Sequence, residues 1–557
     1  MPKCRKCNQE FIISDFEIKF LDRISPVIGG RKYQIPQPVF CSECRLRFRT
    51  VHRNEAYLFK NVSAKSGREI ISLYSPEMPW NKELKLYTPE EWWQDDWDGL
   101  DYGRDFDFSR PFFEQFNELA RAVPRLALMI SNCQNSDYTT GTGYCKNCYL
   151  VNCSENDEDC YYGKLIQSSR DIMDSDFVYK SELCYGCFNI TECYHCLYLS
   201  YGLHCHDCYF SENLHGCSSC LFCTNLTNQE YCIRNKSVTK EDFEKAKDEV
   251  LGSRTKVSQA VKILNELRQK RIHKYAAVVK CQNSTGDFLT NCKNCTDCYD
   301  CNDSEDCKYV VVGVNVKDLV DCSNMYLKQE LAYQVLGTID IYDVIFSLYI
   351  FYSQHIMYSE SCWSSKNLFG CCGLRNKEYC VFNKQYTEEE YNKLVPRIIE
   401  HMQKTGEWGN YFPAQYSPFP YNHTVAHDYL SLTKEETLEL GCYWLEVGAK
   451  EKLPATSELP DKISEATDGV INEMFACREC GRNYKIVKQE LIRLRQLQMP
   501  LPDKCSYCRQ AERMQKRNPR RLYDRVCNKC SKEIKTTYPP TRPEQIYCEE
   551  CYQKEIY

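Results

Sequence analysis

The sequence lacks the local signatures of several enzyme and membrane-protein classes. It contains no phosphate-cradling glycine loop, no HExxH motif and no GxSxG motif. Its longest apolar stretch, IDIYDVIFSLYIF from Ile339, includes Asp340 and Asp343 and is too short to span a bilayer. No signal peptide follows Met1. We therefore expect a cytoplasmic protein with no membrane partner.

Cysteine, in contrast, is abundant, with 39 among the 557 residues. Disulfides do not persist in a reducing compartment, so metal binding or buried thiols explain this content better than a disulfide framework. The chain is also too long for one hydrophobic core, which predicts several domains.

The net charge of −6 is unevenly divided along the chain. Residues 1–70 hold 14 Lys and Arg against 7 Asp and Glu, and residues 477–525 hold 14 against 5. Residues 71–476 hold 38 against 60. The basic ends could bind nucleic-acid phosphates, or they could dock on the acidic centre of their own chain.

The two ends are copies of one module. CSECRLRFRTVHRN from Cys41 matches CSYCRQAERMQKRN from Cys505, 464 residues later, and CRKC at Cys4 matches CREC at Cys477. Two CxxC turns supply four thiolates, the closed tetrahedral shell of structural Zn²⁺. The second turn opens a predicted helix, as in a treble-clef finger. The spacing predicts three zinc ions, at Cys4, Cys7, Cys41 and Cys44; at Cys477, Cys480, Cys505 and Cys508; and at Cys527, Cys530, Cys548 and Cys551.

The third of these sites has no counterpart near the N-terminus. In the shared register its four cysteines fall on or near three hydroxyl residues and a glutamate: Ser63, Ser66, Thr88 and Glu91. Hydroxyls are poor ligands for a closed zinc site, so we expect the N-terminal copy to have lost its second ion.

A second duplication fills the centre. FNELARAVPRLALMISNCQNS from Phe116 matches LNELRQKRIHKYAAVVKCQNS from Leu264, 148 residues later. Each copy begins with an amphipathic helix and ends with a helix capped at Thr239 or Thr387. Between them, short strand-like segments recur every ten to thirteen residues, which predicts a mainly β fold with helices, built on a β-solenoid-like core. An irregular, metal-stapled fold is the alternative.

The sequence therefore predicts five segments. They are an N-terminal zinc module with a Trp- and Asp-rich junction (1–108), two cysteine-rich repeat units (109–252 and 253–400), a Pro- and aromatic-rich connector with a helix (401–475), and tandem C-terminal zinc modules (476–557). The junction, EWWQDDWDGLDYGRDFDF from Glu91, is interpreted as packing; a hydrolytic or cation site is the alternative.

Arginines recur at positions i, i+4 and i+8 after the second CxxC of both module copies, and this spacing places them on one helix face. They are Arg45, Arg49 and Arg53 in the N-terminal copy and Arg509, Arg513 and Arg517 in the C-terminal copy. Contact with RNA or DNA phosphate is one interpretation. The alternatives are a solvated face that offsets the charge of the thiolates, or docking on the acidic centre.

Twenty-seven cysteines lie outside the three sets, mostly in the repeat units. The segments ECYHC (from Glu192) and HCHDC (from His204) contain good metal ligands. Packing of free cysteines as small apolar side chains is the preferred interpretation, with additional metal binding and redox activity as alternatives.

Four segments carry a resemblance to a known group: WDGLDYGRDFDFSRPFFEQFNEL, KNLFGCCGLRNKEYCVFNKQYTEEEY, GEWGNYFPAQYSPFPYN and PLPDKCSYCR followed by RNPRRLYDRVCNKC. They resemble cysteine-rich zinc-ribbon proteins of candidate-phyla, ultra-small bacteria. The resemblance implies Zn²⁺ at the cysteine sets and implies no activity.

These features predict a non-enzymatic zinc-binding scaffold with an elongated core and a protein partner. The first alternative is a factor that binds RNA, DNA or the ribosome through its basic zinc modules. The second is a thiol redox or metal-handling protein that uses the central cysteines.

Overall fold

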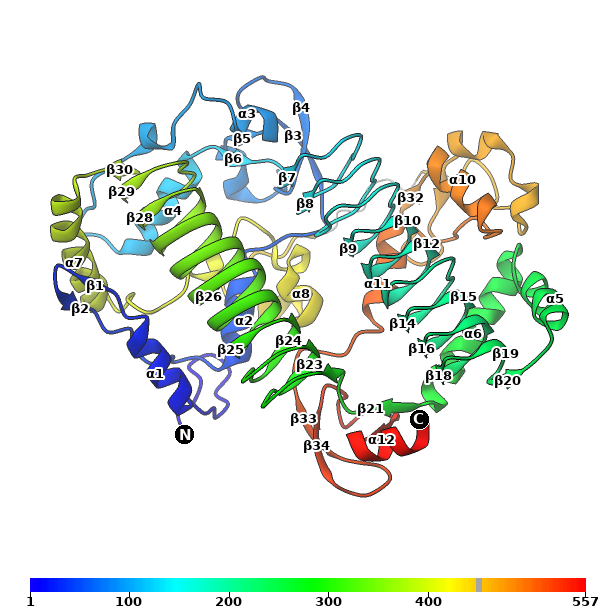
Figure 1. The fold of residues 1–557 in the computed structure, drawn as a ribbon. Coiled ribbons are helices and arrows are strands. Elements are labelled where there is room, and N and C mark those ends of the chain that lie inside the picture. Colours follow the sequence, from blue (N-terminus) through cyan, green and yellow to red (C-terminus); the bar gives the residue numbers. More distant parts are fainter. Residues whose placement is uncertain (447–452, 557) are drawn as a thin grey trace. The chain divides into compact units, whose positions relative to one another are not determined.

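The computed structural model describes residues 1–446 and 453–556. The chain forms two compact units, neither of which is contiguous in sequence. The first unit comprises Met1–Leu128, Ala276–Leu445 and Arg520–Leu522. The second comprises Met129–Tyr275, Glu446–Pro519 and Tyr523–Tyr557. The N-terminal module therefore folds with the second repeat, and the C-terminal modules fold with the first repeat (Figure 1).

This division by contacts differs from the five linear segments expected from the sequence, which remain a prediction. Residues 447–452 of the expected connector lie outside the described residues.

The first repeat forms a ladder of short strands, called here the first ladder (130–237), that pair in parallel at an interval of twelve residues. In β11, Asp176 pairs with Lys164 of β9 on one side and with Phe188 of β13 on the other. Its longest sheet has the order β18-β16-β14-β13-β11-β9. The strands are β7 (Ile130–Ser131), β8 (Thr142–Gly143), β9 (Lys164–Gln167), β10 (Arg170–Met173), β11 (Asp176–Tyr179), β12 (Glu182–Tyr185), β13 (Phe188–Thr191), β14 (Ser200–Leu203), β15 (His206–Tyr209), β16 (Glu212–His215), β17 (Ser218–Leu221), β18 (Thr224–Thr227), β19 (Glu230–Ile233) and β20 (Lys236–Ser237).

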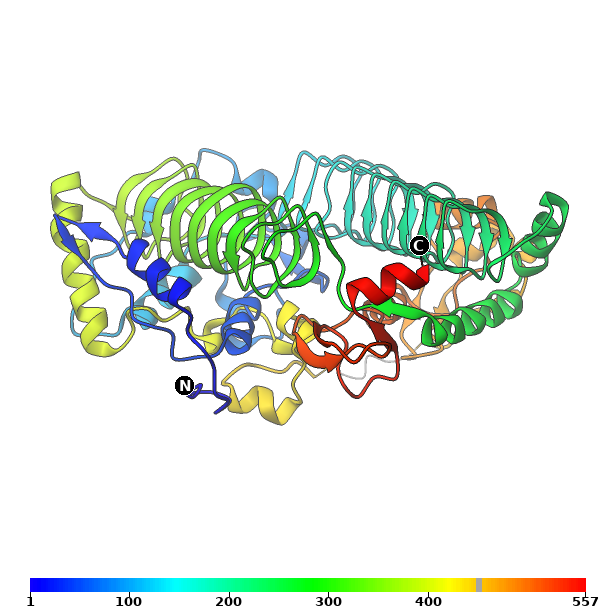
Figure 2. The ribbon, with the colours of Figure 1, turned by 60° about the horizontal axis from the view of Figure 1, so that its bottom comes forward.

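The second repeat forms an equivalent second ladder (278–385), in which the pairing interval is eleven residues at the first strands and twelve at those that follow. Tyr299 pairs with Val311, and Leu348 pairs with Glu360. Because β26 pairs with segments twelve residues before and after it, this run is wound into the successive turns visible in Figure 2. The strands are β22 (Val278–Val279), β23 (Gly286–Thr290), β24 (Cys298–Asn302), β25 (Glu305–Lys308), β26 (Val311–Met357), β27 (Glu360–Trp363), β28 (Lys366–Phe369), β29 (Glu378–Val381) and β30 (Lys384–Gln385).

Every third residue of the first ladder, from Asn132 to Arg234, has a left-handed backbone conformation. Asp171 and Asp174, for example, have φ values of 58° and 50°. Most of the residues that follow these turns lie in the core, as Ile172 does with 0% exposure. A left-handed conformation costs about 1–2 kcal/mol in a residue other than glycine, so the hydrogen bonds between successive turns must offset a recurring strain.

Helices cover both ladders, and their predicted caps are present. The Thr239 hydroxyl accepts from the amide of Asp242 at the start of α5 (Lys240–Val250), and Thr387 forms a capping box with Glu390 at the start of α7 (Glu388–Thr405). On the second ladder, Phe112 of α4 (Phe112–Ala122) packs against Phe369. The equivalent helix α6 (Arg254–Lys270) packs on the first ladder.

The terminal modules consist of short helices and two-stranded hairpins. The N-terminal module contains α1 (Asp15–Arg23), β1 (Val27–Ile28), β2 (Arg31–Lys32), α2 (Ser42–Thr50), β3 (Phe59–Val62), β4 (Glu69–Ser72), β5 (Leu86–Tyr87) and α3 (Pro89–Trp92), and β5 pairs with β6 (Arg125–Leu126). The C-terminal modules contain β31 (Phe475–Ala476), β32 (Asn483–Tyr484), α10 (Lys488–Gln496), α11 (Ser506–Met514), β33 (Tyr523–Val526), β34 (Glu533–Thr536), β35 (Gln545–Tyr547) and α12 (Glu549–Ile556), and β35 pairs with β21 (Ile272–Lys274). The connector holds α8 (Val425–Tyr429) and α9 (Lys434–Glu439).

The Trp- and Asp-rich junction packs on the second ladder. The side chain of Trp92 is 1% exposed, and its Nε1 donates to the carbonyl of Pro124 at 3.1 Å. The guanidinium of Arg375 lies over the Trp92 ring and donates to the carbonyls of Trp92 and Trp97 at 3.0 Å. These contacts favour the interpretation of this segment as a packed junction. They give no support to the alternative of a hydrolytic or cation site.

Candidate metal centres

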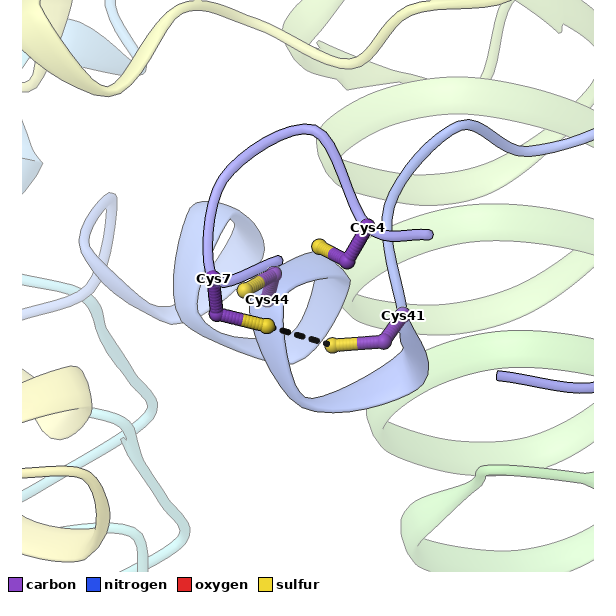
Figure 3. A group of neighbouring side chains, drawn as sticks. All are labelled: Cys4, Cys7, Cys41 and Cys44. Carbon is purple, nitrogen blue, oxygen red and sulfur yellow. Dashed lines mark hydrogen bonds between the residues drawn. The ribbon is translucent and has the colours of Figure 1, made fainter. Parts of the chain in front are cut away.

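The structure brings each predicted set of four cysteines together. Within each set, the four sulfur atoms lie within 4.8 Å of one another. In the first set, shown in Figure 3, the Sγ atoms of Cys7 and Cys41 are 3.7 Å apart. The corresponding distances are 3.8 Å for Cys480 and Cys505 and 3.7 Å for the third set. Four sulfurs at about 2.3 Å from a tetrahedral ion lie about 3.8 Å from each other, so these distances fit Zn²⁺.

Local structure fixes the positions of these thiols. The first CxxC lies in a tight turn, in which the amide of Asn8 donates to the carbonyl of Cys4 at 2.9 Å. The second CxxC opens a helix as predicted, because Cys41 is the N-cap of α2 and Cys505 is the N-cap of α11. Neither cap residue forms a side-chain hydrogen bond to the helix backbone.

At least one thiol in each set has a lowered pKa, although burial alone would raise it. A hydrogen bond from the Cys44 thiol is the main cause that lowers the pKa of Cys41, to about 5. Backbone amides lower the pKa of Cys477 to about 7 and that of Cys527 to about 6, against the opposing effect of burial. Each set thus offers a thiolate at neutral pH, the form that binds metal.

The degenerate fourth set also comes together, as a hydrogen-bonded cluster. The Oγ of Ser63 donates to Oε2 of Glu91 at 2.6 Å, and the same oxygen accepts from the amide of Thr88 at 3.0 Å. The amides of Lys65 and Ser66 donate to Oγ of Ser63 at 3.1 Å. Direct hydrogen bonds between protein groups therefore connect the positions that hold cysteine in the C-terminal copy.

In the first unit, the arginines that follow the first cysteine set are buried in ion pairs. Nε of Arg45 is 2.7 Å from Oδ2 of Asp321, and Nη1 of Arg49 is 3.2 Å from Oδ1 of the same residue. Asp321 belongs to the second ladder and is 0% exposed. Nη2 of Arg45 also lies 3.4 Å from Oε1 of Glu17 in α1. Together these groups form the first docking network (Glu17, Arg45, Arg49 and Asp321).

The second unit repeats this arrangement with the C-terminal module and the first ladder. Nε of Arg509 is 3.0 Å from Oδ1 of Asp174, and its Nη2 is 3.2 Å from Oε1 of Glu490 in α10. Arg513 contacts Asp174 through Nη1 at 3.1 Å and Asp176 through Nε at 2.7 Å. These groups form the second docking network (Glu490, Arg509, Arg513, Asp174 and Asp176).

Burial opposes the charge of these guanidinium groups, but the neighbouring carboxylates outweigh it. The pKa of Arg45 is raised beside Asp321, and that of Arg509 is raised beside Asp174 and Glu490. Arg45 and Arg509 therefore stay charged and paired inside the protein.

The third arginine of each series has a different environment. Nε of Arg53 lies 2.5 Å from Oε1 of Glu55, and Arg517 lies over the ring of Phe177.

The geometry of the docked arginines favours docking on the acidic centre over phosphate binding, because their guanidinium groups face protein carboxylates. The carboxylates that receive them carry no local motif, although Glu17 and Glu490 occupy matching positions in the repeated module.

The cysteines inside the ladders bond in the same way as serines. The Oγ of Ser175 donates to the carbonyl of Met173 at 2.9 Å and accepts from the amide of Cys187 at 3.0 Å. The Sγ of Cys187 donates to the carbonyls of Tyr185 at 3.5 Å and Cys196 at 3.2 Å. Among residues 1–446 and 453–556, no further group of three or more candidate ligands is as close as the three terminal sets. This supports core packing of the interior thiols.

The histidines of ECYHC and HCHDC lie outside this core. Nδ1 of His195 is 2.6 Å from Oδ1 of Asp207, and Nδ1 of His206 is 3.5 Å from Oδ2 of the same residue. Cys193 and Cys208 of these segments are buried in the ladder. The thiols and imidazoles of these two segments do not form a common ligand set within 4.8 Å.

Comparison with known proteins leaves the family and activity open. No protein-family model and no curated protein matches the chain. Three solved chains match in a structural comparison. One is described as a "putative acetyltransferase" from Desulfovibrio desulfuricans G20; it is 8% identical, with a TM-score of 0.11, and the match covers 50% of this chain and 81% of that one. A similarity of this size carries no argument about fold or function.

No helix in the described part of the chain is both long enough and apolar enough to cross a bilayer.

Proposed function

We propose that this protein is a non-enzymatic, zinc-binding scaffold that recruits a protein partner in the cytoplasm. The observation that carries the proposal is the presence of three tetrathiolate sets whose sulfur spacing suits a closed tetrahedral ion. A set with four protein ligands leaves no open coordination position for substrate, so its role is structural.

The proposal includes the finer architecture. The parallel pairing at twelve-residue intervals supports two β-solenoids, each turn being four steps of three residues. The CxxC at the start of α2 and α11 supports treble-clef fingers, and the hairpin β33–β34 followed by α12 supports a zinc ribbon. The four quoted segments also support kinship with the cysteine-rich zinc-ribbon proteins of candidate-phyla bacteria.

Metal analysis of the purified chain tests this function. We expect three zinc ions per chain, and fewer than two would overturn the proposal. A filter-binding assay at low salt, where phosphate contacts are strongest, tests the nucleic-acid alternative. We expect no binding through the docked arginines, so Arg509→Gln with Arg513→Gln should leave any measured affinity unchanged.

A further inference from the structure

The two docking networks connect each zinc finger directly to a ladder. Cys44 and Arg45 are adjacent in α2, and Cys508 and Arg509 are adjacent in α11. The residue that would bind metal and the residue that enters the ladder thus share the first turn of one helix. This coincidence occurs twice, in two units with different acceptor residues.

Both helices are too short to be stable on their own. Both α2 and α11 have nine residues, and isolated helices shorter than about 12–15 residues are marginal in water. Their N-cap residues, Cys41 and Cys505, make no side-chain capping bond, which would otherwise contribute about 1 kcal/mol. Metal ligation at these cysteines would take over the role of a cap.

The ladders, in contrast, do not depend on the fingers for their backbone hydrogen bonds. Strand β11 pairs with β9 and β13, and β26 pairs with β24 and β25. If α11 left, Asp174 and Asp176 would become hydrated carboxylates on a ladder whose strands keep their native pairing, although the hydrogen bonds next to the uncovered face would open more often. Release of a finger is therefore a local event.

We propose that the two fingers are zinc-dependent latches: bound metal keeps α2 and α11 helical and their arginines inserted into the ladders, and loss of metal releases each helix and uncovers the ladder face. The latch rests on the proposed zinc binding. It makes accessibility of a ladder surface a function of metal occupancy.

Hydrogen exchange of the native full-length chain, before and after treatment with a strong zinc chelator, tests the latch. We expect amides in β9 to β11, where Asp174 and Asp176 receive the arginines of α11, to exchange about tenfold faster or more once the metal is removed. Amides in β17 and β19, which α5 covers instead, should change less than about twofold. Unchanged exchange in β9 to β11 after confirmed zinc loss would overturn the latch. An equal increase in β17 and β19 would also overturn it, because zinc would then stabilise the whole ladder.

A variant separates docking from metal binding. Arg509→Gln with Arg513→Gln should give fast exchange in β9 to β11 while three zinc ions remain bound, and chelation should add little further change. The matched control is Arg478→Gln, whose side chain is 65% exposed in an ion pair with Asp503 and should behave like the parent. If the double variant loses one zinc ion, the arginines serve the metal set and the latch is refuted. Absence of zinc from the parent protein would refute both the latch and the proposed function.

Discussion

The two terminal modules dock through arginines at equivalent positions, but these arginines pair with different carboxylates in the two units. In the first unit a single residue, Asp321, accepts both arginines, and Nε and Nη2 of Arg49 have no hydrogen-bond partner. In the second unit, two ladder carboxylates, Asp174 and Asp176, accept from the arginines. Arg513 also donates to the carbonyl of Tyr162 at 2.9 Å. The arginine positions are repeated while the acceptors vary, so the helix face is the fixed element and the ladder is the adaptable one.

The largest expected effect comes from breaking a cysteine set in each finger. Cys505→Ser and Cys41→Ser should each remove one zinc ion and unfold the affected finger, because apparent binding free energies of about 10–16 kcal/mol in zinc-finger peptides are largely folding free energy. Metal analysis and limited proteolysis measure both effects. Unchanged cleavage within 477–519 in Cys505→Ser would show that this set is not structural.

Removing the acceptor carboxylates should separate the two networks. Asp321→Ala removes the acceptor of the buried Arg49 guanidinium and leaves Arg45 with Glu17 at 3.4 Å, so it should destabilise the first unit by about 3–5 kcal/mol. Asp174→Ala should cost about half as much, since Arg513 keeps Asp176 and Arg509 keeps Glu490. Urea denaturation measures both. Equal losses would mean that sharing between two carboxylates gives no protection.

The cluster at Ser63 and Glu91 sharpens the contrast between the module copies. Glu91→Ala should destabilise the N-terminal module by about 2–3 kcal/mol, because it removes a buried carboxylate that accepts from Ser63 and Thr88, and zinc content should stay at three. Denaturation and metal analysis provide the two readouts. A fall in zinc content would contradict the assignment of this cluster as metal-free.

The converse change restores the ligands. Replacing Ser63, Ser66, Thr88 and Glu91 together by cysteine should raise the zinc content from three to four if the backbone positions still match those of the C-terminal site. A count that stays at three would show that the backbone has diverged as well as the side chains.

A pH-dependent effect compares the two ladder interiors. Burial raises the pKa of Asp157 from 3.8 to about 8, and the second ladder has Ser304 at the equivalent step. The folded state therefore retains a proton that the unfolded chain releases, and the contribution of Asp157 to stability falls as pH rises from about 4 to 8, by at most about 1.4 kcal/mol per pH unit. Asp157→Ser should remove this slope in denaturation series. An identical slope in the variant would place the titration elsewhere.

Sequence patterns predicted the features that depend on local spacing. The CxxC pairs gave the three metal sets, because two thiols at that spacing share one turn whatever surrounds them. The repeated register places Ser63 and Glu91 at ligand positions of the third set, and these two residues are hydrogen-bonded to each other. The capping pattern located Thr239 and Thr387. The strand interval observed, twelve residues, lies inside the expected ten to thirteen.

Features that depend on contacts between distant residues were not predictable. The arginine series looks the same in sequence whether it faces solvent or a buried carboxylate such as Asp321, so burial decided between the interpretations. The association of the N-terminal module with the second ladder leaves no local trace either. The left-handed step at every third residue was missed because it occurs at residues as different as Phe177, Lys180 and Leu183.

The N-terminal module packs on the second ladder and the C-terminal modules pack on the first, so neither unit can be completed until late in synthesis. Arg45 leaves the ribosome 276 residues before Asp321, which at about 5–20 residues per second is a wait of about 14–55 s. The first ladder waits in turn for Arg509, 335 residues after Asp174. For most of translation, Arg45 and Asp174 lack the partners that are synthesised later in the chain. We therefore expect early metal binding at the first cysteine set and the rate of elongation both to affect the yield of correctly folded protein.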